Sequence, residues 1–117
     1  MTKVRFFVRD KLLCGIESRG HSGYASEGKD IVCSAVTTVI SMTECYMNDV
    51  CGLKTSVELN NDEPRVSVKL EGGTDAEKQS CHKFLQAAKA ILEEIAREYS
   101  LWLRVSVVSE DCGKKNL

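Results

Sequence analysis

The chain has 117 residues, of which 43% are hydrophobic and 28% are charged, and its formal net charge is -1. This length is typical of one domain with one core, and the near-neutral charge gives no support to a dominant electrostatic partner. The first residues, MTKVRFFVRDKLL, have charges every two or three positions, which predicts neither a signal peptide nor a membrane span. We therefore expect one cytoplasmic domain over residues 1–117, with no membrane partner and no direct nucleic-acid partner.

The N-terminal residues alternate in polarity with the period of a strand that buries one face. Val4, Phe6 and Val8 are the apolar set, and a second short strand over residues 14–18 follows a turn at residues 10–12. The pair is predicted to be a hairpin. Its second strand leads directly into Gly20 and His21.

The period changes to that of a helix at Ile31, where apolar residues begin to recur every three or four positions. Asp30 is the expected N-cap, and Gly52 is the expected stop because glycine readily takes the left-handed conformation after the last helical residue. These limits place Cys33 in the first turn of the helix.

A second hairpin is predicted over residues 53–60 and 66–71, with NNDEP as its turn. Thr74 and Glu77 then match a capping box ahead of a long apolar helical stripe that ends near Tyr99. A last strand is expected over residues 101–108, and the tail from about residue 110 is expected to be exposed and without fixed structure.

The element order is therefore β-β-α-β-β-α-β. Hairpins followed by helices predict an α+β fold with a mixed or mainly antiparallel β-sheet packed against two amphipathic helices.

The six cysteines do not form a metal-binding pattern. The nearest pair, Cys45 and Cys51, has five residues between its members, and no CxxC is present. We expect reduced thiols, most of them buried as small hydrophobic residues, and no metal or other cofactor. The remaining cysteines are Cys14, Cys33, Cys81 and Cys112.

The segment RGHSGYASEGKDIVC carries the most chemistry. A cysteine in the first turn of a helix faces unpaired backbone N–H groups and the positive end of the helix dipole, which favour its thiolate. His21 is a candidate general base for Cys33, and the free N–H groups are candidate oxyanion donors. The segment therefore predicts a nucleophile, a base and an oxyanion hole.

Three glycines, Gly20, Gly23 and Gly28, predict a flexible loop that gates this site. Asp30 has two alternative roles, as the helix N-cap or as a carboxylate that orients His21, although its charge would oppose thiolate formation. The sequence alone leaves both open.

Plainer interpretations compete with catalysis. A cysteine at the start of an amphipathic helix is more often a small buried hydrophobic residue than a nucleophile. A glycine-rich loop before a helix can instead hold a phosphate, but GHSGYASEGKD has neither the Walker nor the GxGxxG spacing. His82 is predicted to face solvent, and Phe6, Phe7, Phe84 and Trp102 are predicted to be core residues.

The segment GHSGYASEGKDIVCSAVTTVI resembles the signature of the ribosomal-processing cysteine proteases called Prp. The resemblance is close from Gly20 to Thr37 and loose over the rest of the chain. It implies a catalytic dyad of His21 and Cys33, a gating loop between them and a supporting role for Asp30. Thr37 stands where the family commonly has serine.

The same resemblance implies a substrate and an assembly. The family removes an N-terminal extension from the twenty-seventh protein of the large ribosomal subunit, cutting after a phenylalanine, and its members tend to form homodimers. The expected partner is therefore the precursor of that ribosomal protein. The alternatives are a non-catalytic ribosome-associated protein-binding module and another thiol hydrolase that uses the same dyad.

Overall fold

The computed structural model describes residues 1–20, 27–60 and 65–110, and from Glu27 to Asp30 it describes the backbone alone. The elements in chain order are β1 (Thr2–Arg9), β2 (Leu12–Arg19), α1 (Glu27–Glu44), η1 (Cys45–Val50), β3 (Thr55–Asn60), β4 (Arg65–Leu70), α2 (Asp75–Glu98) and β5 (Leu103–Ser109). The predicted α+β order is confirmed, with η1 added as a π-helical end of the first helix.

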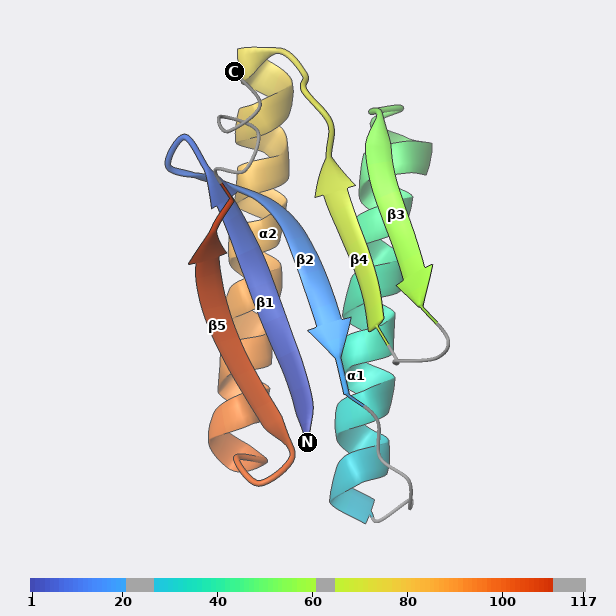
Figure 1. Cartoon of the computed structure of the whole chain (residues 1–117), viewed down its shortest axis with the longest axis vertical. Helices are drawn as coiled ribbons and strands as arrows, with labels where there is room; N and C mark the ends of the chain where they lie inside the picture. The colour runs from blue at the N-terminus through green and yellow to red at the C-terminus, as the bar shows by residue number, and fades with distance from the viewer. Residues whose placement is uncertain (21–26, 61–64, 111–117) are drawn as a thin grey trace.

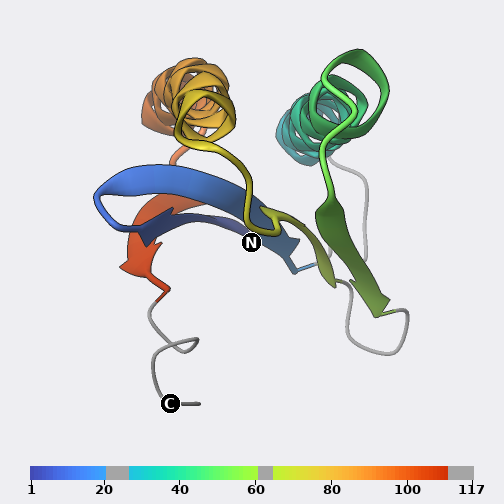
Figure 2. The same cartoon turned by 90° about the horizontal axis from the view of Figure 1, so that it is seen from above.

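The five strands form one sheet in the order β3-β4-β2-β1-β5. The β1–β5 pair is parallel and the other three pairs are antiparallel, so the sheet is mixed. Asp10 and Lys11 join β1 to β2 with φ values of 54° and 69°, the left-handed conformation that tight hairpin turns require. Figures 1 and 2 show α1 and α2 side by side on one face of the sheet, with no helix on the other.

The core lies between that face and the two helices. The predicted alternation of β1 is confirmed, because Val4 and Phe6 are fully buried among the helical residues. Phe7 points the other way, so it is buried on the helix-free face rather than in the core. The helices contribute Val32, Val36, Ile40, Cys81, Leu85, Ala88 and Leu92 to the core.

The start of α2 is confirmed as predicted. Thr74 Oγ1 accepts a hydrogen bond from the Glu77 N–H at 3.2 Å, and the Glu77 carboxylate accepts one from the Thr74 N–H at 2.8 Å. This reciprocal capping box satisfies two of the N–H groups that a helix leaves free.

The predicted start of the first helix is wrong. The helix begins at Glu27, three residues before Asp30, so Asp30 is not its N-cap and Gly28 belongs to its first turn. A single glycine costs a helix only about 1 kcal/mol, and acidic residues in the first turn favour the helix dipole. Residues 27–30 are therefore the first turn of the helix, which the buried side chains of Val32 and Val36 hold against the core.

The predicted helix stop at Gly52 is confirmed, but the last part of the helix is a π-helix instead of an α-helix. After Glu44 the backbone continues as the π-helix η1, which ends with the Cys51 N–H donating to the Tyr46 carbonyl at 2.9 Å. Gly52 follows with a φ of 64°. Tyr46, within η1, stacks on Phe84 of α2 with the ring centroids 4.5 Å apart.

The last described residue is Glu110, at the start of the tail that is expected to be exposed. Its carboxylate binds Arg9 at 2.6 Å and Lys69 at 2.7 Å, and its side chain is 10% exposed. Residues 111–117 lie outside the described residues. Among those described, no helix is long and apolar enough to cross a membrane.

Candidate active site

Cys33 is the seventh residue of α1 and is half-buried. It lies on the flank of the buried stripe formed by Val32, Val36 and Ile40. The cysteine is therefore packed against the core on one side and exposed on the other.

The predicted position of Cys33 in the first helical turn is wrong, because α1 starts three residues earlier than expected. By helix geometry its N–H donates to the carbonyl of Lys29 and belongs to the internal ladder. The free N–H groups lie one turn earlier, in the direction in which a helical side chain leans. The Cys33 backbone itself is therefore not a candidate oxyanion donor.

Cys33 points away from the second helix. A small apolar groove of about 170 Å³ lies between α1 and α2, and Val39 and Met42 form its α1 side. Cys33 is six residues before Val39, which places the two side chains about 120° apart around the helix. The exposed side of Cys33 is thus on the flank of α1 that does not face α2.

β2 ends at Arg19, directly before Gly20, at the same end of the molecule where α1 begins (Figure 1). Its φ is +96°, and a Cβ placed there would lie 2.3 Å from the carbonyl oxygen of Met1. Only glycine fits both conditions. This glycine fixes where the chain leaves the sheet, directly before His21.

The remaining predicted site residues fall into two groups. His21 and Gly23 lie outside the described residues, so the geometry of the proposed dyad is not described. Asp30 lies in the helix one turn before Cys33, and Thr37 is exposed one turn after it. The structure thus places Asp30, Cys33 and Thr37 along one side of α1.

Sequence reasoning missed an ion-pair cluster next to Gly20. Glu17 is 4% exposed on the helix-free face, and its carboxylate binds Arg5 at 2.7 Å and Arg19 at 3.0 Å, with Arg65 at 4.0 Å. The cluster ties the end of β2 to β1 and β4. Alternating charges at these positions were the available signal, but they identify a cluster only when the strand register is known.

Two other cysteines are confirmed as buried structural residues. Burial raises the pKa of the Cys81 thiol to about 11, with smaller contributions from Cys51, Glu77 and Cys14. Burial also raises the pKa of Cys14, and Arg9 opposes the shift. Neither thiol is suited to be a nucleophile at neutral pH. The described residues contain no cluster of three or more metal-ligating side chains.

The prediction that His82 faces solvent is wrong. The imidazole is half-buried, and its Nδ1 accepts a hydrogen bond from the Leu13 N–H at 2.9 Å. Leu13 lies beside the irregularity in the β1–β2 pairing, where its N–H takes a partner outside the sheet. His82 therefore joins α2 to β2 and has a structural role.

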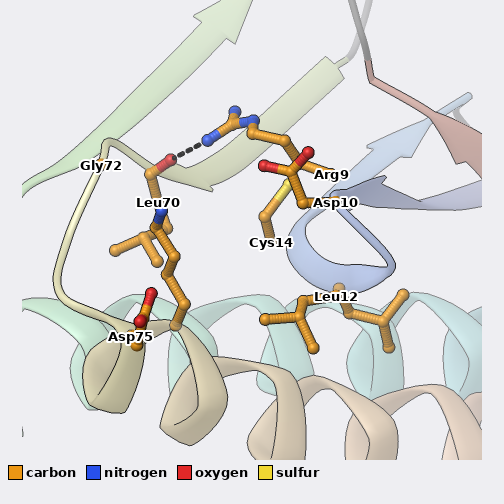
Figure 3. A pocket seen from close by; sticks show the side chains of 9 residues that line it. Arg9, Asp10, Leu12, Cys14, Leu70, Gly72 and Asp75 are labelled. Atoms are coloured by element: carbon orange, nitrogen blue, oxygen red, sulfur yellow. Dashed lines mark hydrogen bonds between the residues drawn. The ribbon is translucent and has the colours of Figure 1, made fainter.

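A pocket of about 320 Å³ lies at the β1–β2 turn (Figure 3). Cys14, Leu70 and Asp75 line it, and Arg9 closes one side by donating to the Leu70 carbonyl at 3.1 Å. This turn and the start of α2 are at the opposite end of the molecule from the start of α1 (Figure 1). The pocket is therefore separate from Cys33.

In sequence, the chain is similar to proteins of the cysteine protease Prp family. A sequence model described as cysteine protease Prp matches residues 1–103. The ribosomal processing cysteine protease Prp of Bacillus subtilis is 26% identical over 98 residues, covering 83% of this chain and 88% of that protein.

Two solved structures share the fold. SMU.848 from Streptococcus mutans matches with a TM-score of 0.80 and 20% identity, over 94% of this chain and 96% of that one. The ribosomal processing protease Prp from S. aureus, in complex with a substrate peptide, matches with a TM-score of 0.76 and 17% identity. That match covers 92% of this chain and 100% of the S. aureus chain.

Proposed function

The chain belongs to the cysteine protease Prp family, and we propose that it removes the N-terminal extension of the twenty-seventh large-subunit ribosomal protein. The proposed cut follows a phenylalanine, with Cys33 as nucleophile and His21 as general base. The observation that supports the proposal is the placement of Cys33, half-buried on the outer flank of α1, near the end of the molecule where β2 finishes and Gly20 follows.

The surroundings of the other thiols support Cys33 as the nucleophile. Cys14 and Cys81 are buried, and burial raises the pKa of each. Cys45 is exposed but lies in η1, more than two helical turns beyond Cys33 and away from Gly20. Cys33 combines partial exposure with a position near the start of the helix.

The proposed reaction follows the chemistry of thiol proteases. Cys33 attacks the scissile carbonyl as a thiolate, and His21 donates a proton to the departing amine. Water, deprotonated by His21, then hydrolyses the thioester and restores the thiol. The free amides of the first turn of α1 lie one turn before Cys33, on the side toward which its sulfur leans.

Asp30 and Thr37 are proposed as supporting residues. Asp30 is three residues before Cys33 and Thr37 is four after it, the spacings at which helical side chains are neighbours. We assign to Asp30 the role of orienting the His21 imidazole. Gly20 and Gly23 are proposed to allow the loop between them and Cys33 to open and close over the substrate.

The test is cleavage of the precursor ribosomal protein with its native extension, followed by mass spectrometry. We expect one cut after phenylalanine with the unaltered protein, and none with Cys33→Ala or His21→Ala. Cys45→Ala removes an exposed thiol of the same helical segment and is the matched control, expected to cleave normally. An intact substrate with the folded, unaltered protein would instead favour a non-catalytic binding module.

A homodimer in the cytoplasm is part of the same proposal. Light scattering coupled to size-exclusion chromatography measures the assembly directly. We expect a mass close to twice the 13.0 kDa of one chain. A mass of one chain at all concentrations used would remove the dimer from the proposal without affecting the dyad.

A further inference from the structure

Positive and negative charges are separated between the two layers of the fold. The five strands carry seven Lys or Arg residues against two Glu residues. The helical segments α1, η1 and α2 carry nine Asp or Glu residues against five Lys or Arg residues. The formal net charge of -1 therefore conceals a basic sheet and an acidic helical layer, whose charges largely cancel.

Four of the sheet cations form one row on the helix-free face. Lys3 of β1 is directly opposite Arg104 of β5 on one side and Arg19 of β2 on the other. Arg19 is in turn opposite Arg65 of β4. Directly paired residues share a face, and Val4, next to Lys3, points into the core, so the row faces away from the helices.

This arrangement is unfavourable within the fold itself. Like charges directly opposite each other on neighbouring strands are destabilising. Glu17 provides one carboxylate beside the row, which it shares among Arg5, Arg19 and Arg65. Lys3 and Arg104 are exposed and form no ion pair with any residue in the described ranges. The row therefore concentrates positive charge, and no described carboxylate pairs with Lys3 or Arg104.

From this row we propose that the helix-free face binds the phosphodiester backbone of single-stranded nucleic acid. Neighbouring strands are about 4.8 Å apart, so four cations span about 14 Å, a length that a few consecutive phosphates can occupy. Arg guanidinium groups have five N–H donors, so Arg19 and Arg65 can bind a phosphate while they keep Glu17.

Within the described strands, the same face has no exposed aromatic ring on which a base could stack. Phe6 and Phe7 are the aromatic residues of the described strands, and Phe6 is in the core. Phe7 is 5% exposed, with Lys69 Nζ 4.2 Å and the Arg5 guanidinium 5.5 Å from its ring centre. A covered ring cannot stack on a base. The proposed binding is therefore independent of base sequence and depends on charge.

The row lies at the end of the sheet where β2 finishes and α1 begins (Figure 1). It is on the face opposite the helices, so a nucleic acid bound there leaves α1 accessible (Figure 2). The proposal does not depend on protease activity and can fail or hold separately from it.

Fluorescence anisotropy with a short labelled oligouridylate tests the proposal. Neutralisation of four phosphates predicts a salt exponent of about 2.8, so raising KCl from 50 to 200 mM should weaken binding by about 50-fold. The double variant Lys3→Ala/Arg104→Ala removes two of the four contacts. Its salt dependence should fall to a change of about sevenfold over the same range.

The matched control is Lys78→Ala/Lys83→Ala, which removes two positive charges from α2 in the other layer. We expect it to bind the RNA like the unaltered protein. Thermal unfolding of the row variant should be unchanged or shifted upward, because repulsion between adjacent cations is removed.

Three results would overturn the proposal. One is no binding to the oligouridylate at 50 mM KCl, and another is an equal loss of binding in both double variants. The third is tighter binding of an oligoglutamate peptide of equal charge, which would assign the row to an acidic protein segment instead.

Discussion

Each of the two helices has a cysteine as its seventh residue, Cys33 in α1 and Cys81 in α2. Cys81 is fully buried, and its burial raises the thiol pKa to about 11. Cys33 is half-buried on the flank of its helix. The same distance from a helix start therefore gives two different thiols, and the face of the helix decides which one is buried.

The histidines extend this contrast. His82 follows Cys81 directly in the chain, yet it accepts a hydrogen bond from the Leu13 N–H and joins two elements. His21 is twelve residues before Cys33 and directly follows Gly20, whose backbone only glycine can adopt. Cys81 and His82 are adjacent in the sequence and have structural roles, whereas the members of the proposed catalytic pair are twelve residues apart.

The largest expected difference between the two cysteines is in activity. Cys33→Ala should lower the rate of precursor cleavage by roughly 10³-fold or more, because it removes the proposed nucleophile. Cys81→Ala should cleave at a nearly unchanged rate but lose about 1 kcal/mol of stability, equal to roughly 4 °C in Tm. Cleavage kinetics and thermal unfolding of both variants measure this, and a loss of activity confined to folded Cys81→Ala would reverse the assignment.

Alkylation should separate the thiols without any substrate. With iodoacetamide near neutral pH, we expect Cys33 to be modified faster than the exposed Cys45, because His21 is the proposed base of Cys33 alone. Cys14 and Cys81 should be modified only when the protein unfolds. Peptide mapping by mass spectrometry gives the order, and equal rates at Cys33 and Cys45 would be evidence against an activated thiolate.

The Cys81 thiol should make stability depend on alkaline pH. Its pKa is about 11 in the folded protein against 9.0 for a free thiol, so the folded state favours the neutral form. The contribution is fully present below pH 9 and is lost as the pH rises to about 11. The slope in that window is about 1.4 kcal/mol per pH unit.

Urea unfolding at several pH values measures this slope. Cys81→Ala should show a shallower decline, with the remaining part due to Cys14, whose pKa is also raised by burial. An identical slope in both proteins would mean that Cys81 ionises as easily in the folded state as in the unfolded one.

The smallest effect is expected at His82. His82→Ala leaves the N–H of the buried Leu13 without its acceptor and should cost about 1 kcal/mol in the free energy of unfolding. Cleavage should be unaffected, because His82 belongs to the structural pair. Chemical denaturation combined with the cleavage assay distinguishes this from a catalytic role, which a drop in rate at full stability would indicate.

Much of the fold could be predicted from local patterns. The alternation of Val4 and Phe6 gave the first strand, and Thr74 with Glu77 gave the start of α2, because each pattern is decided by neighbouring residues. The start of α1 could not be predicted in this way. Gly28 and the polar residues around it favour a loop locally, and packing of Val32 and Val36 outweighs that preference.

The sequence proposes the residues of the candidate site, but the structure changes the setting of Cys33. Cys33 was identified from its segment, while its helical turn was wrong because it depended on the helix start. The interaction of His82 with Leu13 joins residues 69 positions apart, and the row of Lys3, Arg19, Arg65 and Arg104 exists only through strand register. Such long-range pairings are not visible in one sequence.

The most direct measurement is covalent trapping of the nucleophile. A peptide with the sequence of the extension to be removed, ending in a phenylalanine chloromethyl ketone, would be incubated with the unaltered protein and the adduct mapped by mass spectrometry. The account predicts one adduct per chain, on Cys33, and none when His21 is replaced by alanine. An adduct on Cys45 or another thiol, with Cys33 unmodified in a protein that still cleaves its precursor, would contradict it.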